Sequence, residues 1–314
     1  RQGPITTAGA LREGAAQVWR EAKNNLCFDW EIGDRAAVDA AFARAAHVTR
    51  LEFVNNRIVV NSMEPRVAIG DYDKNDDKYV LYTSSQGVHG LQRQLAGNIF
   101  KVPNHKVRVV TRDVGGGFGM KIFLYPEQAL VVWAAKKVGR PVKWTGDRSE
   151  AFTSDTQGRD HVTTAELALD ADGKFLGMRV STVANLGAYL SNFGPFIPTL
   201  AGAKMYAAVY TCPAIHFAVK GVFTNTVPVD AYRGAGRPEA TYVVERIVEQ
   251  AAREMKLDPA EIRKRNFIRE FPYQTPVALM YDTGNYEATL EAAQKLADVP
   301  GYAKRKAESA KRGK

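Results

Sequence analysis

Hydrophobic and polar residues follow two spacings along the chain, and each spacing predicts its own kind of element. Apolar side chains that recur on one helical face predict helices over residues 10–22, 34–46, 90–96, 126–138 and 239–255, with a further helix from Pro259. Alternation of apolar and polar positions predicts strands over residues 48–54, 57–60, 78–83, 106–111, 141–144 and 216–223. Residues 161–190 predict a hairpin that turns at 170–173. Because helices and strands mix without a repeat, we expect an α+β fold with mixed β-sheets and packed helices.

The same pattern divides the chain into three parts. Residues 1–30 show little periodicity and begin without an initiator methionine or the apolar core of a signal peptide, so we interpret them as a connector from an absent upstream domain. Residues 31–300 contain most of the expected elements and form the predicted domain. Residues 301–314 concentrate positive charge, and we expect them to form a solvated basic tail.

Composition narrows the class of protein. Hydrophobic residues make up 45% of the chain and charged residues 25%, as in ordinary soluble globular proteins. No stretch approaches the roughly 20 apolar residues that cross a bilayer. Cys27 and Cys212 are too few for a disulfide framework or for a zinc or iron–sulfur site, which favours a reducing, cytoplasmic setting. Much of the net charge of +9 lies in the tail, so we expect no nucleic-acid partner.

The most distinctive stretch is a glycine-rich loop at residues 114–121, between an expected strand and an expected helix. It holds Gly115, Gly116, Gly117 and Gly119, whose backbone amides a ligand can approach because no side chain shields them. The spacing fits neither the dinucleotide fingerprint nor a Walker loop, since no serine or threonine follows Lys121. Taken alone, the loop is equally compatible with a tight structural turn.

Two further loops hold polar side chains. Residues 231–238 place Arg233 among small residues, which suits an arginine that faces a ligand or one that forms an ion pair at a helix start. Residues 84–89 end an expected strand with Gln86 and His89. A lone histidine such as His89 more often makes a structural hydrogen bond than a metal bond, so we assign it no metal.

Taken together and in this order, three stretches resemble the cofactor loops of molybdenum hydroxylase large subunits, the family of xanthine dehydrogenase, aldehyde oxidase and aerobic carbon monoxide dehydrogenase. They are residues 83–86, residues 115–119 and residues 231–240. Residues 61–66 and 245–266 are similar to supporting stretches of the same family. The likeness covers most of the chain, and it points to the carbon monoxide dehydrogenase branch in a form without the copper cysteine.

The resemblance implies a first molybdopterin-binding domain, which holds one side of a molybdenum–molybdopterin cofactor, in bacteria often the cytosine dinucleotide form. Gln86 would donate its amide to an oxygen ligand of the metal, and Phe118 would lie above the metal. The other residues that would line the pterin and metal are Gly116, Gly117, Gly119, Arg233, Gly234 and Ala235. The pterin dithiolene holds molybdenum in this family, so no protein side chain is expected to be a metal ligand.

Several positions depart from the branches of the family. The glutamate with which xanthine oxidisers recognise a purine is replaced by Ile122, their stacking phenylalanine by Ala235, and no arginine lies within residues 198–204. The cysteine that holds copper in carbon monoxide dehydrogenases is replaced by Gly234. We therefore expect neither purine oxidation nor a molybdenum–copper centre, and the small residues favour an aldehyde or an aromatic heterocycle as substrate.

The resemblance also places the catalytic glutamate, a general base, in a second molybdopterin-binding domain downstream of Lys314. We therefore expect no catalytic residue within residues 1–314 and no turnover by this chain alone. Expected partners are that second domain, an iron–sulfur (2Fe-2S) small subunit and an FAD medium subunit, in a dimer of heterotrimers. A non-catalytic module that binds cofactor or partners is the alternative. A nucleic-acid binder is a third hypothesis, which lacks basic strands rich in aromatic residues.

Overall fold

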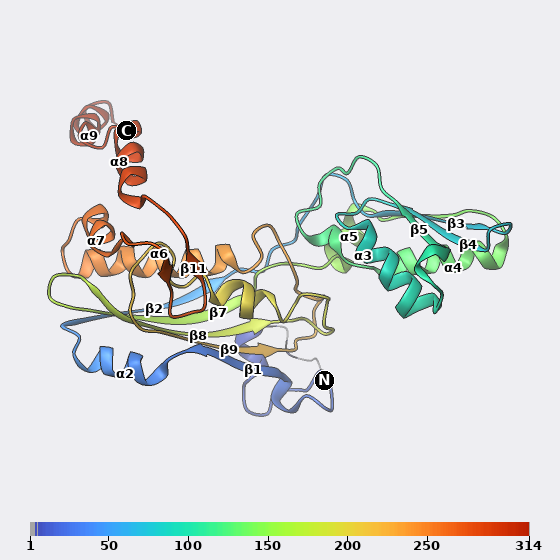
Figure 1. Ribbon diagram of the computed structural model, residues 1–314, viewed down its shortest axis with the longest axis horizontal. Helices are drawn as coiled ribbons and strands as arrows, with labels where there is room; N and C mark the ends of the chain where they lie inside the picture. The colour runs from blue at the N-terminus through green and yellow to red at the C-terminus, as the bar shows by residue number, and fades with distance from the viewer. Residues whose placement is uncertain (1–3, 5, 314) are drawn as a thin grey trace.

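Two β-sheets organise the chain, and each is the centre of its own lobe (Figure 1). The computed structural model describes Pro4 and residues 6–313. The large lobe holds a five-stranded sheet in the order β1-β9-β8-β7-β2, and the small lobe a four-stranded sheet in the order β5-β4-β3-β6. The strands of the large sheet are β1 (Leu26–Gly33), β2 (His47–Asn55), β7 (His161–Leu169), β8 (Phe175–Asn185) and β9 (Ile215–Val222). Those of the small sheet are β3 (Val67–Asp73), β4 (Lys78–Thr83), β5 (Val107–Val110) and β6 (Val142–Thr145).

Both sheets are mixed, which confirms the expected α+β class. Strands β8 and β9 pair in parallel in the large sheet, and β4 and β5 pair in parallel in the small one, whereas the neighbouring pairs are antiparallel. The domain predicted over residues 31–300 spans both lobes.

The large sheet packs one face against helix α6 (Arg237–Glu254). Alternate strand residues such as Leu167 and Phe217 point toward α6 and are almost fully buried, and Ile247 of the helix meets them in the same core. The opposite face is more polar, and α2 (Arg35–Ala43) covers part of it. This division follows from the two-residue period of a strand, which sends successive side chains to opposite faces.

In the small lobe, α4 (Pro126–Val138) packs against one face of the four-stranded sheet. Gly70 of β3 permits this close approach, because a Cβ atom there would lie 2.3 Å from the carbonyl group of Val131. Helix α3 (Val88–Arg93) continues into the π-helix η2 (Gln94–Phe100) and lies beside β5. The loops at the ends of β4 and β5 thus belong to the small lobe.

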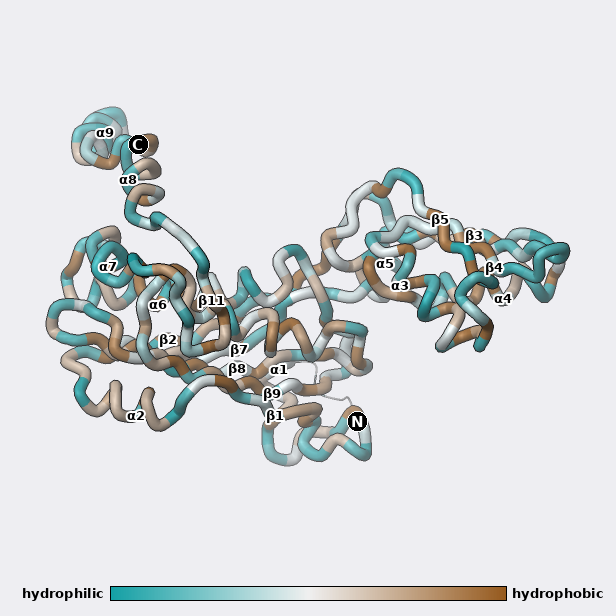
Figure 2. The backbone as a smooth tube through the Cα atoms, in the orientation of Figure 1, coloured by the Kyte–Doolittle hydropathy of each residue, from teal (hydrophilic) through white to brown (hydrophobic). Residues whose placement is uncertain are grey.

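The remaining elements are short or peripheral. They are α1 (Thr7–Ala10), α5 (Arg148–Ser154), α7 (Pro259–Asn266), α8 (Tyr286–Leu296), α9 (Tyr302–Lys311), the 3-10 turns η1 (Lys23–Asn25), η3 (Asn104–Lys106) and η4 (Met120–Ile122), the π-helix η5 (Ile197–Ala201), and a hairpin of β10 (Tyr273–Gln274) and β11 (Met280–Tyr281). Helices α8 and α9 extend away from the large lobe and contain no buried residue (Figure 1). Hydrophilic positions prevail along α9, so the expected basic tail is a solvated helix over most of its described length (Figure 2). Within residue 4 and residues 6–313, no helix is both long and apolar enough to span a bilayer.

Two predicted elements are wrong. Residues 10–22 form no long helix, because α1 ends at Ala10 and the chain then turns through Gly14, whose φ is +74°. Residues 57–60 form no strand, since Ile58 makes only an isolated bridge to Gly158. A short apolar run can favour an extended backbone, but a strand also needs a neighbouring strand with which to pair. No neighbouring strand lies beside residues 57–60 in the described chain.

Several elements were not predicted, among them β1, β3, α5, α8 and α9. Strand β1 begins inside the segment interpreted as a connector, and its residues from Leu26 onward pair with β9, so residues 26–30 belong to the edge of the large sheet. Strand β3 contains Gly70 and two aspartates, which are uncommon in strands, yet it lies between β4 and β6. Its place in the sheet is set by these two neighbours.

Candidate functional site

The three loops that the sequence singled out meet between the two lobes. The amide of Gly119 donates a hydrogen bond to Gln86 Oε1 (2.9 Å), which joins the glycine loop to the loop after β4. The amide of Arg233 donates to the carbonyl of Phe118 (2.9 Å), which joins the glycine loop to the loop before α6. Gln86, Gly119 and Arg233 therefore belong to one continuous site, although they are far apart in sequence.

The contact with Gly119 orients the side-chain amide of Gln86. A backbone N–H can only donate, so its partner on Gln86 is the carbonyl oxygen, and the NH₂ group must point elsewhere. The backbone N–H of Gln86 also donates to the carbonyl of Lys121 (3.0 Å), which holds the loop close to the glycine loop. Gln86 is exposed, and its NH₂ group has no hydrogen-bond partner among the residues that the structure describes. Two N–H donors are thus available to a ligand.

Two glycines allow this close approach. A Cβ atom on Gly117 would lie 2.4 Å from Gln86 Oε1, and one on Gly119 would lie 2.3 Å from the carbonyl oxygen of Ala231. Gly119 also has a φ of +106°, which a residue with a side chain rarely adopts. The glycines are therefore required by the packing of the three loops, whether or not a ligand is present.

Phe118 and Gly116 form the outer part of the glycine loop. Phe118 adopts a left-handed backbone conformation with a φ of +50°, and its side chain is 42% exposed. A Cβ atom on Gly116 would lie 2.8 Å from the ring of Phe118, so the glycine leaves space in which the ring rests. An exposed aromatic ring on a strained backbone is more typical of a ligand site than of a structural turn.

Arg233 presents an exposed guanidinium group. In the described part of the chain it forms no ion pair and no side-chain hydrogen bond, which contradicts the reading of Arg233 as an ion-paired residue at a helix start. Gly234 and Ala235 follow with φ values of +95° and +45°, and they form a tight turn before α6. Arg233, Gly234 and Ala235 thus lie on the surface of the loop that faces the glycine loop.

Arg159 lies beneath this loop, and sequence reasoning did not identify it. Its guanidinium forms a buried ion pair with Glu239 (2.9 Å) and donates to the carbonyls of Tyr232 (3.0 Å) and Arg233 (2.8 Å). The second carboxylate oxygen of Glu239 is buried without a partner among the described residues. Arg159 therefore positions the backbone of the loop from behind, while Arg233 remains free in front.

A second buried cation supports the glycine loop. The side chain of Lys121 is fully buried and pairs with Glu64 Oε2 (2.7 Å), which also accepts a hydrogen bond from the amide of Gly115 (2.8 Å). Partial burial raises the pKa of Glu64, but the hydrogen bonds from Lys121 and Gly115 and the charge of Lys121 outweigh it, so the pKa lies below its usual value. Glu64 lies within residues 61–66. The resemblance of this stretch to the family indicated that the stretch is important, but it did not show the contact between Glu64 and Lys121.

The comparison with protein families shows to which family the chain belongs. The family model described as the molybdopterin cofactor-binding domain matches residues 18–267. This chain belongs to that family. The resemblance expected from the three loops is therefore confirmed, and the glycine loop, Gln86 and Arg233 all lie inside the matched region.

Relatives of known name are molybdenum hydroxylases. The chain is 37% identical over 287 residues to the carbon monoxide dehydrogenase large chain of Hydrogenophaga pseudoflava, and the match covers 90% of this chain and 36% of that relative. It is 31% identical to the nicotine 6-hydroxylase large subunit of Paenarthrobacter nicotinovorans, over 88% of this chain and 34% of the relative. Quinoline 2-oxidoreductase from Pseudomonas putida 86 superposes with a TM-score of 0.90 at 30% identity, over 100% of this chain and 40% of that one. The chain thus spans about a third of the length of these curated relatives.

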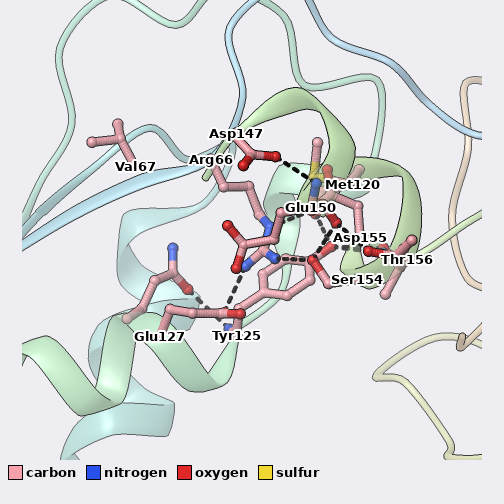
Figure 3. Close-up of polar contacts among 12 residues, drawn as sticks. Arg66, Val67, Met120, Tyr125, Glu127, Asp147, Glu150, Ser154, Asp155 and Thr156 are labelled. Carbon is pink, nitrogen blue, oxygen red and sulfur yellow. Dashed lines mark hydrogen bonds and ion pairs between the residues drawn. The ribbon is translucent and has the colours of Figure 1, made fainter. Parts of the chain in front are cut away.

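In this molybdopterin-binding domain, a buried arginine stabilises the small lobe behind the glycine loop (Figure 3). Arg66 donates to Asp155 Oδ1 (2.5 Å) and to Glu127 Oε2 (2.8 Å), and its guanidinium carbon lies 3.7 Å from the ring centre of Tyr125. Tyr125 in turn donates its hydroxyl to the carbonyl of Met120 (2.9 Å), next to Gly119, and burial raises the pKa of Tyr125 to about 12. The cluster therefore joins α4 and α5 to the end of the glycine loop.

The structure contains no protein-built metal site within residue 4 and residues 6–313. Cys27 lies on β1 and Cys212 is buried, and burial raises the pKa of both thiols, which disfavours the thiolate that a metal requires. A Cβ atom on Gly234 would lie 2.4 Å from Pro238. A cysteine at this position would therefore need the backbone to shift.

Proposed function

We propose that this molybdopterin-binding domain forms one side of a molybdenum active site that hydroxylates an aldehyde or an aromatic N-heterocycle, with water as the source of oxygen. The observation that carries the proposal is the meeting of three loops through two backbone hydrogen bonds, one from Gly119 to Gln86 and one from Arg233 to Phe118. These contacts bring together the loops that carry an amide donor, an aromatic ring and a guanidinium.

The residues present fit a pterin-held metal. Gly117 and Gly119 leave the loop without side chains that would block a planar ligand, and the NH₂ group of Gln86 and the guanidinium of Arg233 are unpartnered in the described chain. The lack of a metal-binding cluster among the described residues agrees with a metal held by the cofactor's own sulfur atoms. When bound, the cofactor would supply the two-electron oxidation chemistry.

The chain's own residues would bind and orient. Gln86 would donate from its NH₂ group to an oxygen ligand of the metal, because its carbonyl is already occupied by Gly119. The ring of Phe118 would exclude water from the cofactor, and Arg233 would stabilise negative charge that develops during oxidation. Gly234 and Ala235 would leave room for a flat or small substrate.

The whole enzyme would need further parts. A second molybdopterin-binding domain would supply the general-base glutamate, and an iron–sulfur subunit and an FAD subunit would remove electrons, in a dimer of heterotrimers within the cytoplasm. We infer the cytosine dinucleotide form of the cofactor from the same resemblance. The names of relatives such as the nicotine 6-hydroxylase large subunit support a multi-subunit enzyme.

The test compares two glycine variants in the enzyme that contains this chain. Gly117→Val places a side chain against Gln86, whereas a Cβ atom at Gly97, in the π-helix η2, points into open space, so Gly97→Val is the matched control. We expect Gly117→Val to lose molybdenum and pterin, measured per mole of protein, while Gly97→Val keeps both. Equal cofactor content in the two variants would refute the assignment of the loop. Cofactor retention without turnover on any aldehyde or heterocycle by the unaltered enzyme would favour the non-catalytic module.

A further inference from the structure

A concave site lies in the small lobe, between α3 and the edge strand β5. It has a volume of about 280 Å³, and its polar lining consists of Lys78, His89, Gln92, His105 and Arg108. No carboxylate of the described chain lines it. Basic and histidine side chains from three separate segments therefore converge on one cavity.

Most of these side chains lack a partner. Within the part of the chain that the structure describes, His89, His105 and Arg108 form no side-chain hydrogen bond and no ion pair. Lys78 approaches a carboxylate only at 3.8 Å, from Asp76 in the preceding turn. The buried arginine Arg66, by contrast, has two acidic partners. The cavity thus holds positive charge and N–H donors that the protein itself does not satisfy.

Gln92 makes the cavity rigid. Its Nε2 donates to the carbonyl of Val107 (2.8 Å) and to that of Asn104 (3.1 Å), so that α3 is joined to β5 and to the turn before it. These bonds fix the backbone on which His89, His105 and Arg108 are carried. Donors whose positions are fixed before a ligand binds lose less conformational entropy on binding.

We propose that this cavity binds the phosphate group of a small molecule. An arginine presents a planar pair of donors that matches phosphate oxygens, and an imidazole offers an N–H in either protonation state. A bare metal ion fits poorly, because the described residues contain no group of three or more metal-binding side chains. The lining of the cavity includes neither Gln86 nor any residue of the glycine loop or of residues 231–238, although α3, which carries His89, begins two residues after Gln86.

The probe is inorganic phosphate, and pyrophosphate in a second titration, added to the full chain. The ring protons of the five histidines report binding directly by NMR. We expect the signals of His89 and His105 to shift and saturate. Those of His47 and His216, which lie in the large lobe beside Glu254 and Glu31, should remain unchanged. Uniform shifts of all histidine signals, or none, would overturn the proposal.

Two charge-removing variants separate a built site from general surface attraction. Arg108→Gln should weaken phosphate binding by about tenfold or more, the usual effect of losing a hydrogen bond to a charged group. Lys143→Gln removes another exposed positive charge, from β6 at the other edge of the same sheet, and should leave binding unchanged. Equal weakening by both variants would contradict the proposal.

A comparison with acetate tests the chemical class of the ligand. Phosphate and pyrophosphate should bind more tightly than acetate at equal ionic strength. Binding of acetate as tight as that of phosphate would show a carboxylate site instead and would overturn the phosphate assignment. Thermal unfolding of each variant without ligand verifies that the small lobe remains folded.

Discussion

Arg159→Met should destabilise the protein strongly, because Arg159 supports the loop that carries Arg233. Arg159 is 7% exposed, and its guanidinium pairs with Glu239 and donates to two loop carbonyls at 3.0 and 2.8 Å. Methionine fills a similar volume but leaves the carboxylate of Glu239, which is 3% exposed, without its cation. Breaking a buried ion pair by removing one partner costs about 3–5 kcal/mol. Against a total free energy of unfolding of about 5–15 kcal/mol, this loss is readily measured.

Urea unfolding followed by tryptophan fluorescence provides the assay, with the midpoint as the measured quantity. Arg263→Met is the matched control, since Arg263 pairs with Glu245 and Glu249 at 3.0 and 3.3 Å in a more exposed position, and its loss of stability should be smaller. The double variant Arg159→Met, Glu239→Leu should recover much of the loss, because no unpaired charge remains buried. If Arg159→Met shifts the midpoint no more than Arg263→Met does, the reasoning is refuted.

Three further predictions concern the glycine loop and its neighbours. Gly119→Ala should lower the free energy of unfolding by about 2 kcal/mol or more, because a Cβ there meets a backbone carbonyl at 2.3 Å; an unchanged urea midpoint would contradict this. Lys121→Met should remove a stabilisation that depends on the ionised carboxylate of Glu64. Burial raises the pKa of Glu64, but Lys121 and the amide of Gly115 lower it below its ordinary value of 4.5. The stabilisation is therefore present above pH 4.5 and is lost as the pH falls through the lower pKa of the folded state. The difference in urea midpoint between this variant and the unaltered protein should therefore shrink from about pH 6 to about pH 3. The enzyme that contains this chain should not oxidise carbon monoxide at a molybdenum–copper centre, because Gly234 offers no thiolate for Cu(I); stoichiometric copper with dye reduction that depends on carbon monoxide would show otherwise.

Periodicity predicted most of the regular elements. The hairpin of β7 and β8, the strand β4 and the helices α4 and α6 lie within a few residues of their predicted bounds. Each has an amphipathic pattern long enough to identify one buried face. The failures had two causes. Residues 10–22 and 57–60 had the pattern without a packing partner, whereas β3, inside the small sheet, had partners without the pattern.

The sequence by itself determined which residue types are available at the site: an amide at Gln86, glycines at Gly117 and Gly119, and an arginine at Arg233. Those residue types, in that order along the chain, were enough to recognise the family. A cofactor that carries its own metal is bound mainly by hydrogen-bond donors and by backbone that no side chain shields.

Only the tertiary structure decided how these residues act. The Gln86 oxygen meets Gly119, 33 residues away, and this leaves the NH₂ group free. Arg159 reaches the loop carbonyl of Arg233 across 74 residues, and Lys121 reaches Glu64 across 57. Local spacing cannot specify such contacts, because each depends on how two lobes bring distant segments together and bury them. Burial also explains why Arg159 and Lys121 stabilise the site. An unpaired charge in the interior is costly whereas one in water is not, so each of these cations needs its carboxylate partner.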